Sequence, residues 1–207
     1  IHGEPSVGKT NINLVFAADV MRSGKRVLFL DPEDNPASIG QRFKALGGRE
    51  SDLRTRLDYV HDPQPKDYEF LKGWVADPKN NIGLVIIDGV AEALALEGIS
   101  EDSPTELLGW YRERVRIFTA SGAGVLLSDH VVKSTESRSR WPRGSGAKLG
   151  HYDGTSIEVR QGQPYSREKA GHVQLIISKD RNGGVGACGQ HIVNLHFTPN
   201  ELTKQTF

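Results

Sequence analysis

The chain has 207 residues, which suits one α/β domain with a substantial core. Its 26 Lys and Arg residues balance its 26 Asp and Glu residues, so no global field recruits nucleic acid and any such binding must be local. The single cysteine, Cys188, excludes a disulfide framework and a cysteine-based zinc site, and no apolar run could span a bilayer, so we expect a cytoplasmic protein.

The first motif is a glycine-rich loop with the pattern of a glycine, four residues and then Gly-Lys-Thr. Its residues are Gly3, Glu4, Pro5, Ser6, Val7, Gly8, Lys9 and Thr10. In such a P-loop, backbone N–H groups surround a phosphate at the start of a helix. Lys9 would reach the β- and γ-phosphates, and the Thr10 hydroxyl would hold Mg²⁺. The motif predicts binding of a nucleoside triphosphate; the alternative is a glycine loop that only caps the next helix.

A P-loop normally follows a buried strand, whereas only two residues precede Gly3. We therefore expect the chain to lack that first strand and whatever lies before it. After the loop, apolar residues at helical spacing predict a helix over residues 10–22. The apolar run Arg26–Leu30 predicts a buried strand, and the acidic loop Asp31–Asn35 follows it. This loop lies at the carboxyl ends of the strands, where ligands bind in open α/β sheets.

The next segments keep the alternation of helices and strands. Asn35 should cap a helix that starts at Pro36 and stops at Gly47. Further patterns predict a strand over 57–60, helices over 67–76 and 104–120, and a strand over 124–128. The residues expected to face inward from the helix over 67–76 are Phe70, Leu71, Trp74 and Val75.

Between the last two of these helices lies a continuous apolar run, Ile82–Ile87, which Asp88 closes. This is the pattern of a Walker B strand, which is fully buried and delivers one carboxylate at its tip. Behind a P-loop, Asp88 would bind Mg²⁺ directly or through water. The alternative is an aspartate that simply starts a turn before Gly89.

From residue 131 to residue 150 the apolar periodicity disappears, and we expect a long, mobile, basic loop. Its basic and aromatic residues are Lys133, Arg138, Arg140, Trp141, Arg143 and Lys148. Strand-like segments follow at 155–160, 172–178 and 190–197, and Asn182-Gly183 between the last two predicts a β-hairpin over residues 172–197. The whole pattern predicts an α/β fold with a mostly parallel central sheet, flanking helices and a β-rich C-terminal extension.

With these residues in order, the chain resembles the RecA-like ATPases, and among them the hexameric replicative helicases of the DnaB and plasmid RepA type. The resemblance covers nearly all of residues 1–207 and implies one RecA-like ATPase domain that uses ATP and Mg²⁺. It rests on the P-loop, a glutamate after the second strand, the Walker B strand, and the late Lys-x-Arg-Asn-Gly that starts at Lys179. The chain departs from DnaB-like helicases at His130, where they usually have glutamine, and in its longer basic loop.

The resemblance implies roles for two residues near the γ-phosphate. Glu33 would orient and deprotonate the attacking water, which suits a carboxylate that is ionised at pH 7. Asp31 and Asp34 are rivals on the same loop, and the acidic cluster could instead only cap the next helix. His130 would sense the γ-phosphate; the alternative is an ordinary hydrogen-bonded loop histidine.

The resemblance also implies contacts outside the chain's own P-loop. The basic loop would line a channel and bind single-stranded DNA, with Trp141 stacking on bases; an ordinary solvated surface segment is the alternative. Arg181, with Lys179 beside it, would act in trans as an arginine finger in a self-associated ring, expected to be a hexamer. The alternative is a turn whose polar residues face water.

Together these features predict the ATP-hydrolysing motor of a ring-forming DNA helicase in phage, plasmid or mobile-element replication. A RecA- or RadA-like recombination ATPase on single-stranded DNA is the first alternative. A regulatory ATP-binding module with a protein partner is the second.

Overall fold

The computed structural model describes residues 1–130, 153–166 and 168–198. The chain divides into two compact units, one of residues 10–128 and the other of residues 1–9 together with 129–207. Within the described residues, no helix is both long and apolar enough to cross a membrane. The residues predicted to bind DNA, which lie outside the described residues, are Lys133, Arg138, Arg140, Trp141, Arg143 and Lys148.

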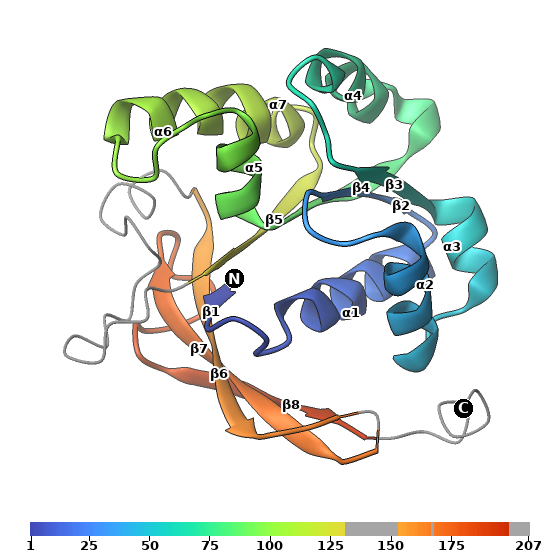
Figure 1. Cartoon of the computed structure of the whole chain (residues 1–207), viewed down its shortest axis with the longest axis vertical. Helices are drawn as coiled ribbons and strands as arrows, with labels where there is room; N and C mark the ends of the chain where they lie inside the picture. The colour runs from blue at the N-terminus through green and yellow to red at the C-terminus, as the bar shows by residue number, and fades with distance from the viewer. Residues whose placement is uncertain (131–152, 167, 199–207) are drawn as a thin grey trace. The chain divides into compact units, whose positions relative to one another are not determined.

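The unit of residues 10–128 is a parallel sheet with helices on both faces (Figure 1). Its strands are β2 (Arg26–Asp31), β3 (Leu57–His61), β4 (Ile82–Asp88) and β5 (Gly124–His130), in the spatial order β3-β2-β4-β5. Its helices are α1 (Lys9–Arg22), α2 (Pro36–Ala45), α3 (Glu50–Arg56), α4 (Asp67–Ala76), α5 (Val90–Leu96), α6 (Pro104–Trp110) and α7 (Arg116–Thr119). A 3₁₀ turn (Pro78–Asn80) precedes β4. The predicted α/β class and mostly parallel sheet are confirmed.

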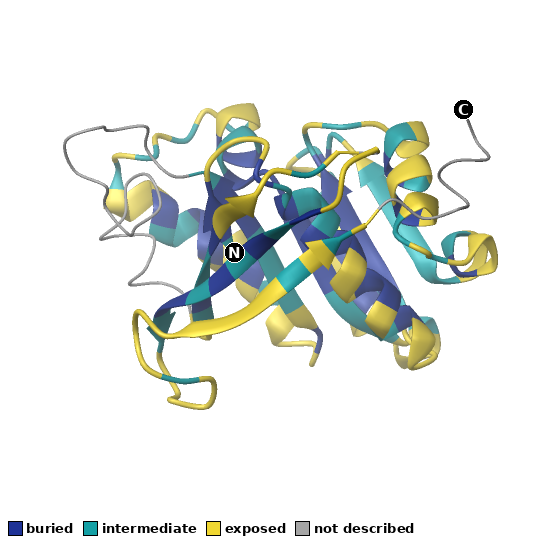
Figure 2. Cartoon of the chain, turned by 90° about the horizontal axis from the view of Figure 1, so that it is seen from below, coloured by how far each residue is buried: buried dark blue, intermediate teal, exposed yellow. Residues whose placement is uncertain are grey.

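Both faces of this sheet are apolar because helices cover both of them. Helices α1 and α2 pack on one face, where Phe29 and Ile86 meet Leu14 and Phe43 in the hydrophobic core (Figure 1). On the other face α4 meets α7, and the rings of Tyr68 and Phe118 have centroids 6.3 Å apart. Buried residues therefore run without a break along β2 and along the second half of β4 (Figure 2).

The start of α2 matches its prediction. The Asn35 side chain accepts a hydrogen bond from the Ser38 N–H (3.0 Å), and Pro36 occupies the first turn. The helix expected over 104–120 is instead divided, because a π-helical turn (Tyr111–Val115) separates α6 from α7. Helices α3 and α5 were not predicted; each is only seven residues long, too short for a clear apolar period.

The expectation that Phe70 faces inward is wrong. Phe70 is 69% exposed, whereas Tyr68 is 2% exposed and shares the buried face of α4 with Leu71 and Val75. These three residues are spaced by three and four positions, so they lie on one side of the helix. Phe70 lies on the other side, where its ring stacks on half-buried Trp74.

The second unit is built around a short strand, β1 (His2–Gly3). This strand runs parallel to the end of β5 and to β6 (Thr155–Gln163). Antiparallel pairing then adds β7 (Gly171–Asp180) and β8 (His191–Phe197). Alternate residues of β7 are buried, whereas β8 is mostly exposed (Figure 2).

The connection between β7 and β8 is longer than the Asn182-Gly183 pair suggests, because it covers residues 181–190. Asp180 organises it: its carboxylate accepts hydrogen bonds from the N–H groups of Asn182 (3.2 Å), Val185 (2.6 Å) and Gly186 (3.2 Å). Three backbone donors on one carboxylate favour a wide loop over a two-residue turn.

Candidate nucleotide-binding site

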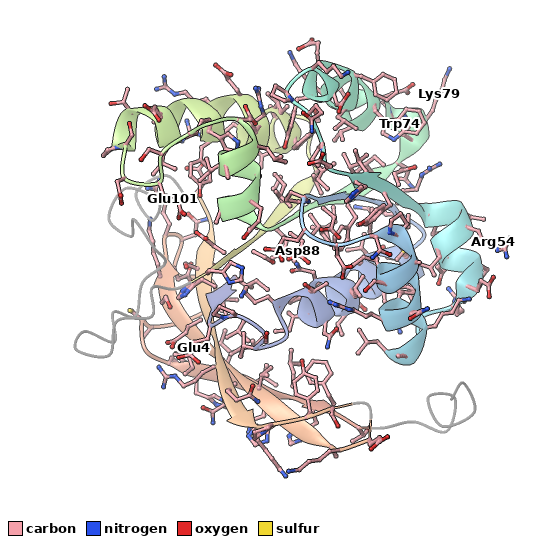
Figure 3. The ribbon with its side chains drawn as sticks, viewed as in Figure 1. Glu4, Arg54, Trp74, Lys79, Asp88 and Glu101 are labelled. Atoms are coloured by element: carbon pink, nitrogen blue, oxygen red, sulfur yellow. The ribbon has the colours of Figure 1, made fainter. Side chains whose placement is uncertain are left out.

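The glycine-rich loop between β1 and α1 has the backbone of an anion-binding nest. Ser6 has a φ of +62° and Gly8 a φ of +102°, so left-handed residues alternate with ordinary ones and turn N–H groups toward one side. Lys9 is buried at the start of α1, and its Nζ donates to the carbonyl oxygens of Gly3 (3.2 Å) and Glu4 (3.1 Å). The loop can therefore offer backbone donors and one ammonium group to a phosphate; Figure 3 labels Glu4 within it.

His130 adjoins the P-loop lysine. Its Nδ1 lies 3.0 Å from Lys9 Nζ, and its backbone N–H donates to Asp129 Oδ1 (2.8 Å). An ammonium group can only donate, so Nδ1 is the acceptor and the neutral imidazole carries its proton on Nε2. The predicted sensor histidine and the predicted phosphate-binding lysine are thus hydrogen-bonded to each other.

A tyrosine that the sequence analysis did not single out lies against the same loop. A Cβ on Gly8 would overlap with Tyr165 Oη, and its three nearest atoms would all belong to Tyr165. The Tyr165 ring is held by Phe197 of β8, with centroids 4.4 Å apart and planes inclined by 19°. No local pattern marks Tyr165, because its contact with Gly8 joins residues 157 positions apart.

In the unit of residues 10–128, Asp88 ends β4 with its side chain 6% exposed (Figure 3). Its carboxylate accepts hydrogen bonds from Thr10, Ser128 and Asn13. Burial raises the pKa of Asp88, and these hydrogen bonds oppose the rise. The two predicted Mg²⁺ ligands, Thr10 and Asp88, are therefore direct neighbours.

The residues around Asp88 fit a small, hard cation. A carboxylate and a hydroxyl are oxygen ligands of the kind that Mg²⁺ prefers. Asn13 Nδ2 donates to Ser128 Oγ (2.6 Å), whereas the buried Asn13 Oδ1 has no hydrogen-bond partner among the described residues. A cation bound to Asp88 would relieve the burial of an ionised carboxylate in this polar cluster.

The acidic loop after β2 separates the three rival carboxylates. Asp31 is buried and accepts from the N–H groups of Glu33 (3.0 Å) and Asp34 (2.9 Å) and from Tyr59 Oη (2.9 Å). Asp34 accepts from Ser38 Oγ (2.9 Å) and pairs with Arg42. Both aspartates therefore shape the loop and the start of α2, and the exposed Glu33 is the carboxylate best placed to act on a solvent molecule.

Glu33 extends toward the end of β4. A Cβ on Gly89 would lie 3.0 Å from Glu33 Oε1 and 2.8 Å from Glu92 Oε2, and the two carboxylates offer oxygens within 4.8 Å of each other. Glu92 lies in the first turn of α5, which the sequence analysis did not predict. Its position four residues after Asp88 was the only available signal.

At the end of β7, Lys179 and Arg181 lie two residues apart. Arg181 Nη1 is 3.3 Å from Asp153 Oδ1 in an exposed ion pair. Burial and then the Arg181 charge lower the pKa of Lys179. The two cations therefore lie close enough for the charge of Arg181 to act on Lys179.

Comparison with known proteins points to one group of relatives. No protein-family model matches the chain. The DNA repair and recombination protein RadB of Methanococcus maripaludis is 28% identical over 139 residues, which are 65% of this chain and 63% of the relative. RadB of Methanococcoides burtonii is 26% identical over 170 residues, 78% of this chain and 72% of the relative. These relatives support a RecA-like P-loop ATPase.

The same relatives correct the expected subfamily, because they give no support to a DnaB- or RepA-type helicase. The match spans a little less than two thirds of the length of the first of these relatives, 63%. ATPase chemistry with a nucleotide and Mg²⁺ agrees with both the relatives and the residues around Asp88.

Proposed function

We propose that this chain is the ATPase core of a protein that acts in DNA recombination and repair. The observation that carries the chemistry is the contact of half-buried Thr10 with buried Asp88, because the P-loop motif supplies one Mg²⁺ ligand, Thr10, and the Walker B motif supplies the other, Asp88. The similarity to RadB supports a role in DNA recombination and repair, because these relatives of the chain are DNA repair and recombination proteins by name.

In this mechanism the backbone N–H groups of the loop Gly3–Lys9, apart from Pro5, would surround the phosphates of ATP, and Lys9 would neutralise charge on the γ-phosphate. Thr10 and Asp88 would hold Mg²⁺, which would supply further positive charge to the phosphate oxygens. Glu33 orients the attacking water and accepts its proton. When Lys9 turns to the γ-phosphate, His130 would lose its hydrogen bond with Lys9, and in this way it would sense the γ-phosphate.

Two further contacts complete the proposal. The basic segment of residues 131–150 binds single-stranded DNA through phosphate contacts and base stacking. Subunits assemble as a filament or ring on that strand, and Arg181, with Lys179, stabilises the transferring phosphoryl group in a neighbouring subunit. Hydrolysis therefore depends on assembly.

The experiment measures ATP hydrolysis with and without single-stranded DNA, and strand displacement on a forked duplex. We expect DNA-stimulated hydrolysis without displacement. Lys9→Ala should abolish hydrolysis, whereas Lys79→Ala, which changes an exposed lysine, should not. Strand displacement would favour the helicase motor, and the absence of DNA binding in filter assays would favour a regulatory ATP-binding module.

A further inference from the structure

A buried hydrogen bond joins β1, at the start of the P-loop, to the end of β7, next to Lys179 and Arg181. His2 Nε2 lies 2.9 Å from Ser178 Oγ, although 176 positions separate them in sequence. His2 directly precedes Gly3, and Ser178 directly precedes Lys179. Their exposed fractions are 1% and 3%, so bulk water does not reach this contact.

Ser178 reaches His2 because it lies in a β-bulge. In the pairing of β6 with β7, Ile157 faces Ile177 and Ser156 faces Lys179, so Ser178 is the extra residue of the bulge. Strand β6 lies between β1 and β7, which places those two strands roughly 9.5 Å apart. A histidine and a serine together span this distance, and the bulge aims the hydroxyl across β6.

The chemistry of the pair argues against a purely stabilising role. Burial lowers the pKa of His2 to about 3, so the imidazole is neutral at physiological pH. His2 Nδ1 has no hydrogen-bond partner among the described residues, and an unpaired buried polar atom destabilises the folded state. Apolar residues of similar size would therefore stabilise the sheet at least as well.

We propose that His2 and Ser178 are a positioning pair that fixes Lys179 and Arg181 relative to the P-loop of the same chain. A shift of the P-loop when phosphate binds moves β1, and the hydrogen bond transmits that movement through Ser178 to the cations. The P-loop of one subunit thereby controls the group that acts on its neighbour. This inference rests on the proposed ATPase function and on the role of Arg181 in it.

The test is a double-mutant cycle on ATP hydrolysis by the assembled protein. Ser178→Ala should lower kcat about tenfold and change the Kd for ATP by less than about twofold, because it misplaces a group that acts in the transition state. In an Arg181→Ala background the same change should lower kcat by no more than about twofold, since the group it positions is already gone. Ser121→Ala removes a serine hydroxyl that donates to the carbonyl oxygen of Ile117 (3.2 Å), so it is the control and should leave kcat unchanged.

An equal loss of kcat in both backgrounds would overturn the proposal, and so would unchanged kcat or a loss confined to ATP affinity. His2 offers a second route if Ser178→Ala does not fold. His2→Gln retains an amide at the reach of Nε2 and should keep most of the activity, whereas His2→Leu should lose as much as Ser178→Ala. Folded His2→Gln and His2→Leu variants with equal activity would contradict the pair.

Lys9→Ala in the same series separates this inference from the proposed function. If Lys9→Ala hydrolyses ATP normally, the ATPase proposal itself fails. If Lys9→Ala is inactive while Ser178→Ala has normal turnover, only the positioning pair fails.

Discussion

Replacing Gly8 by alanine tests the contact between the P-loop and Tyr165. The φ of +102° at Gly8 places an L-residue in the left-handed region, at a cost of about 1–2 kcal/mol. The added Cβ would also overlap with Tyr165 Oη, and relief of such overpacking costs about 1–3 kcal/mol more. We therefore expect Gly8→Ala to lower the free energy of unfolding by about 2–5 kcal/mol.

The second variant, Tyr165→Phe, removes the overlapping hydroxyl. The nearest remaining ring atom, Cζ, would lie 3.2 Å from the new Cβ, a contact that a small shift can relieve. In this background Gly8→Ala should cost only the backbone strain of about 1–2 kcal/mol, so the two changes couple by about 1–3 kcal/mol.

Urea denaturation followed by circular dichroism gives all four free energies of unfolding. Gly24→Ala is the matched control, because Gly24 has a φ of +86° and a Cβ there would meet nothing within 4 Å. It should cost the same in either background. If Gly8→Ala were equally destabilising with Tyr165 and with phenylalanine, the hydroxyl would not lie against the loop and the reasoning would be refuted.

Three other outcomes follow from the site. Glu33→Gln should retain nucleotide binding and lose hydrolysis in a single-turnover assay. Asp31→Asn should mainly lower the melting temperature. Normal turnover in Glu33→Gln would mean that another carboxylate activates the attacking water. Asp88→Asn should abolish hydrolysis and, at pH 8 without Mg²⁺, raise the melting temperature. Burial raises the pKa of Asp88, so its ionised form destabilises the fold above that pKa. The gain in melting temperature should vanish below about pH 4, where the carboxyl group is protonated in both the folded and the unfolded state. Replacing three arginines of the basic segment 131–150 by alanine should weaken the salt dependence of binding to single-stranded DNA. The slope of log affinity against log salt concentration should fall in magnitude by roughly 0.7 for each lost phosphate contact. An unchanged slope would show that these arginines do not contact the DNA phosphates. These three residues are Arg138, Arg140 and Arg143.

The features that the sequence predicted well depend on neighbours in the chain. The P-loop is recognisable because its glycines and its Gly-Lys-Thr ending set a local backbone conformation. Strand β4 is recognisable because a sheet covered on both faces requires a continuous apolar run, which Asp88 then ends. Asn35 and Pro36 likewise mark the start of α2, since capping involves only the first turn of a helix.

The tertiary structure alone decided features that depend on contacts between distant residues. The three carboxylates at the end of β2 and just after it are equivalent in sequence, and only the structure shows that Asp31 is buried and accepts a hydrogen bond from Tyr59, whereas Glu33 is exposed. The outward position of Phe70 follows from the packing of Tyr68 on Phe118, which no helical period specifies. Tyr165 meets Gly8, and Ser178 meets His2, only after β6 and β7 pair beside β1. Sequence patterns report the local chemistry of the backbone and of burial, whereas such pairs depend on how strands far apart in the chain come together.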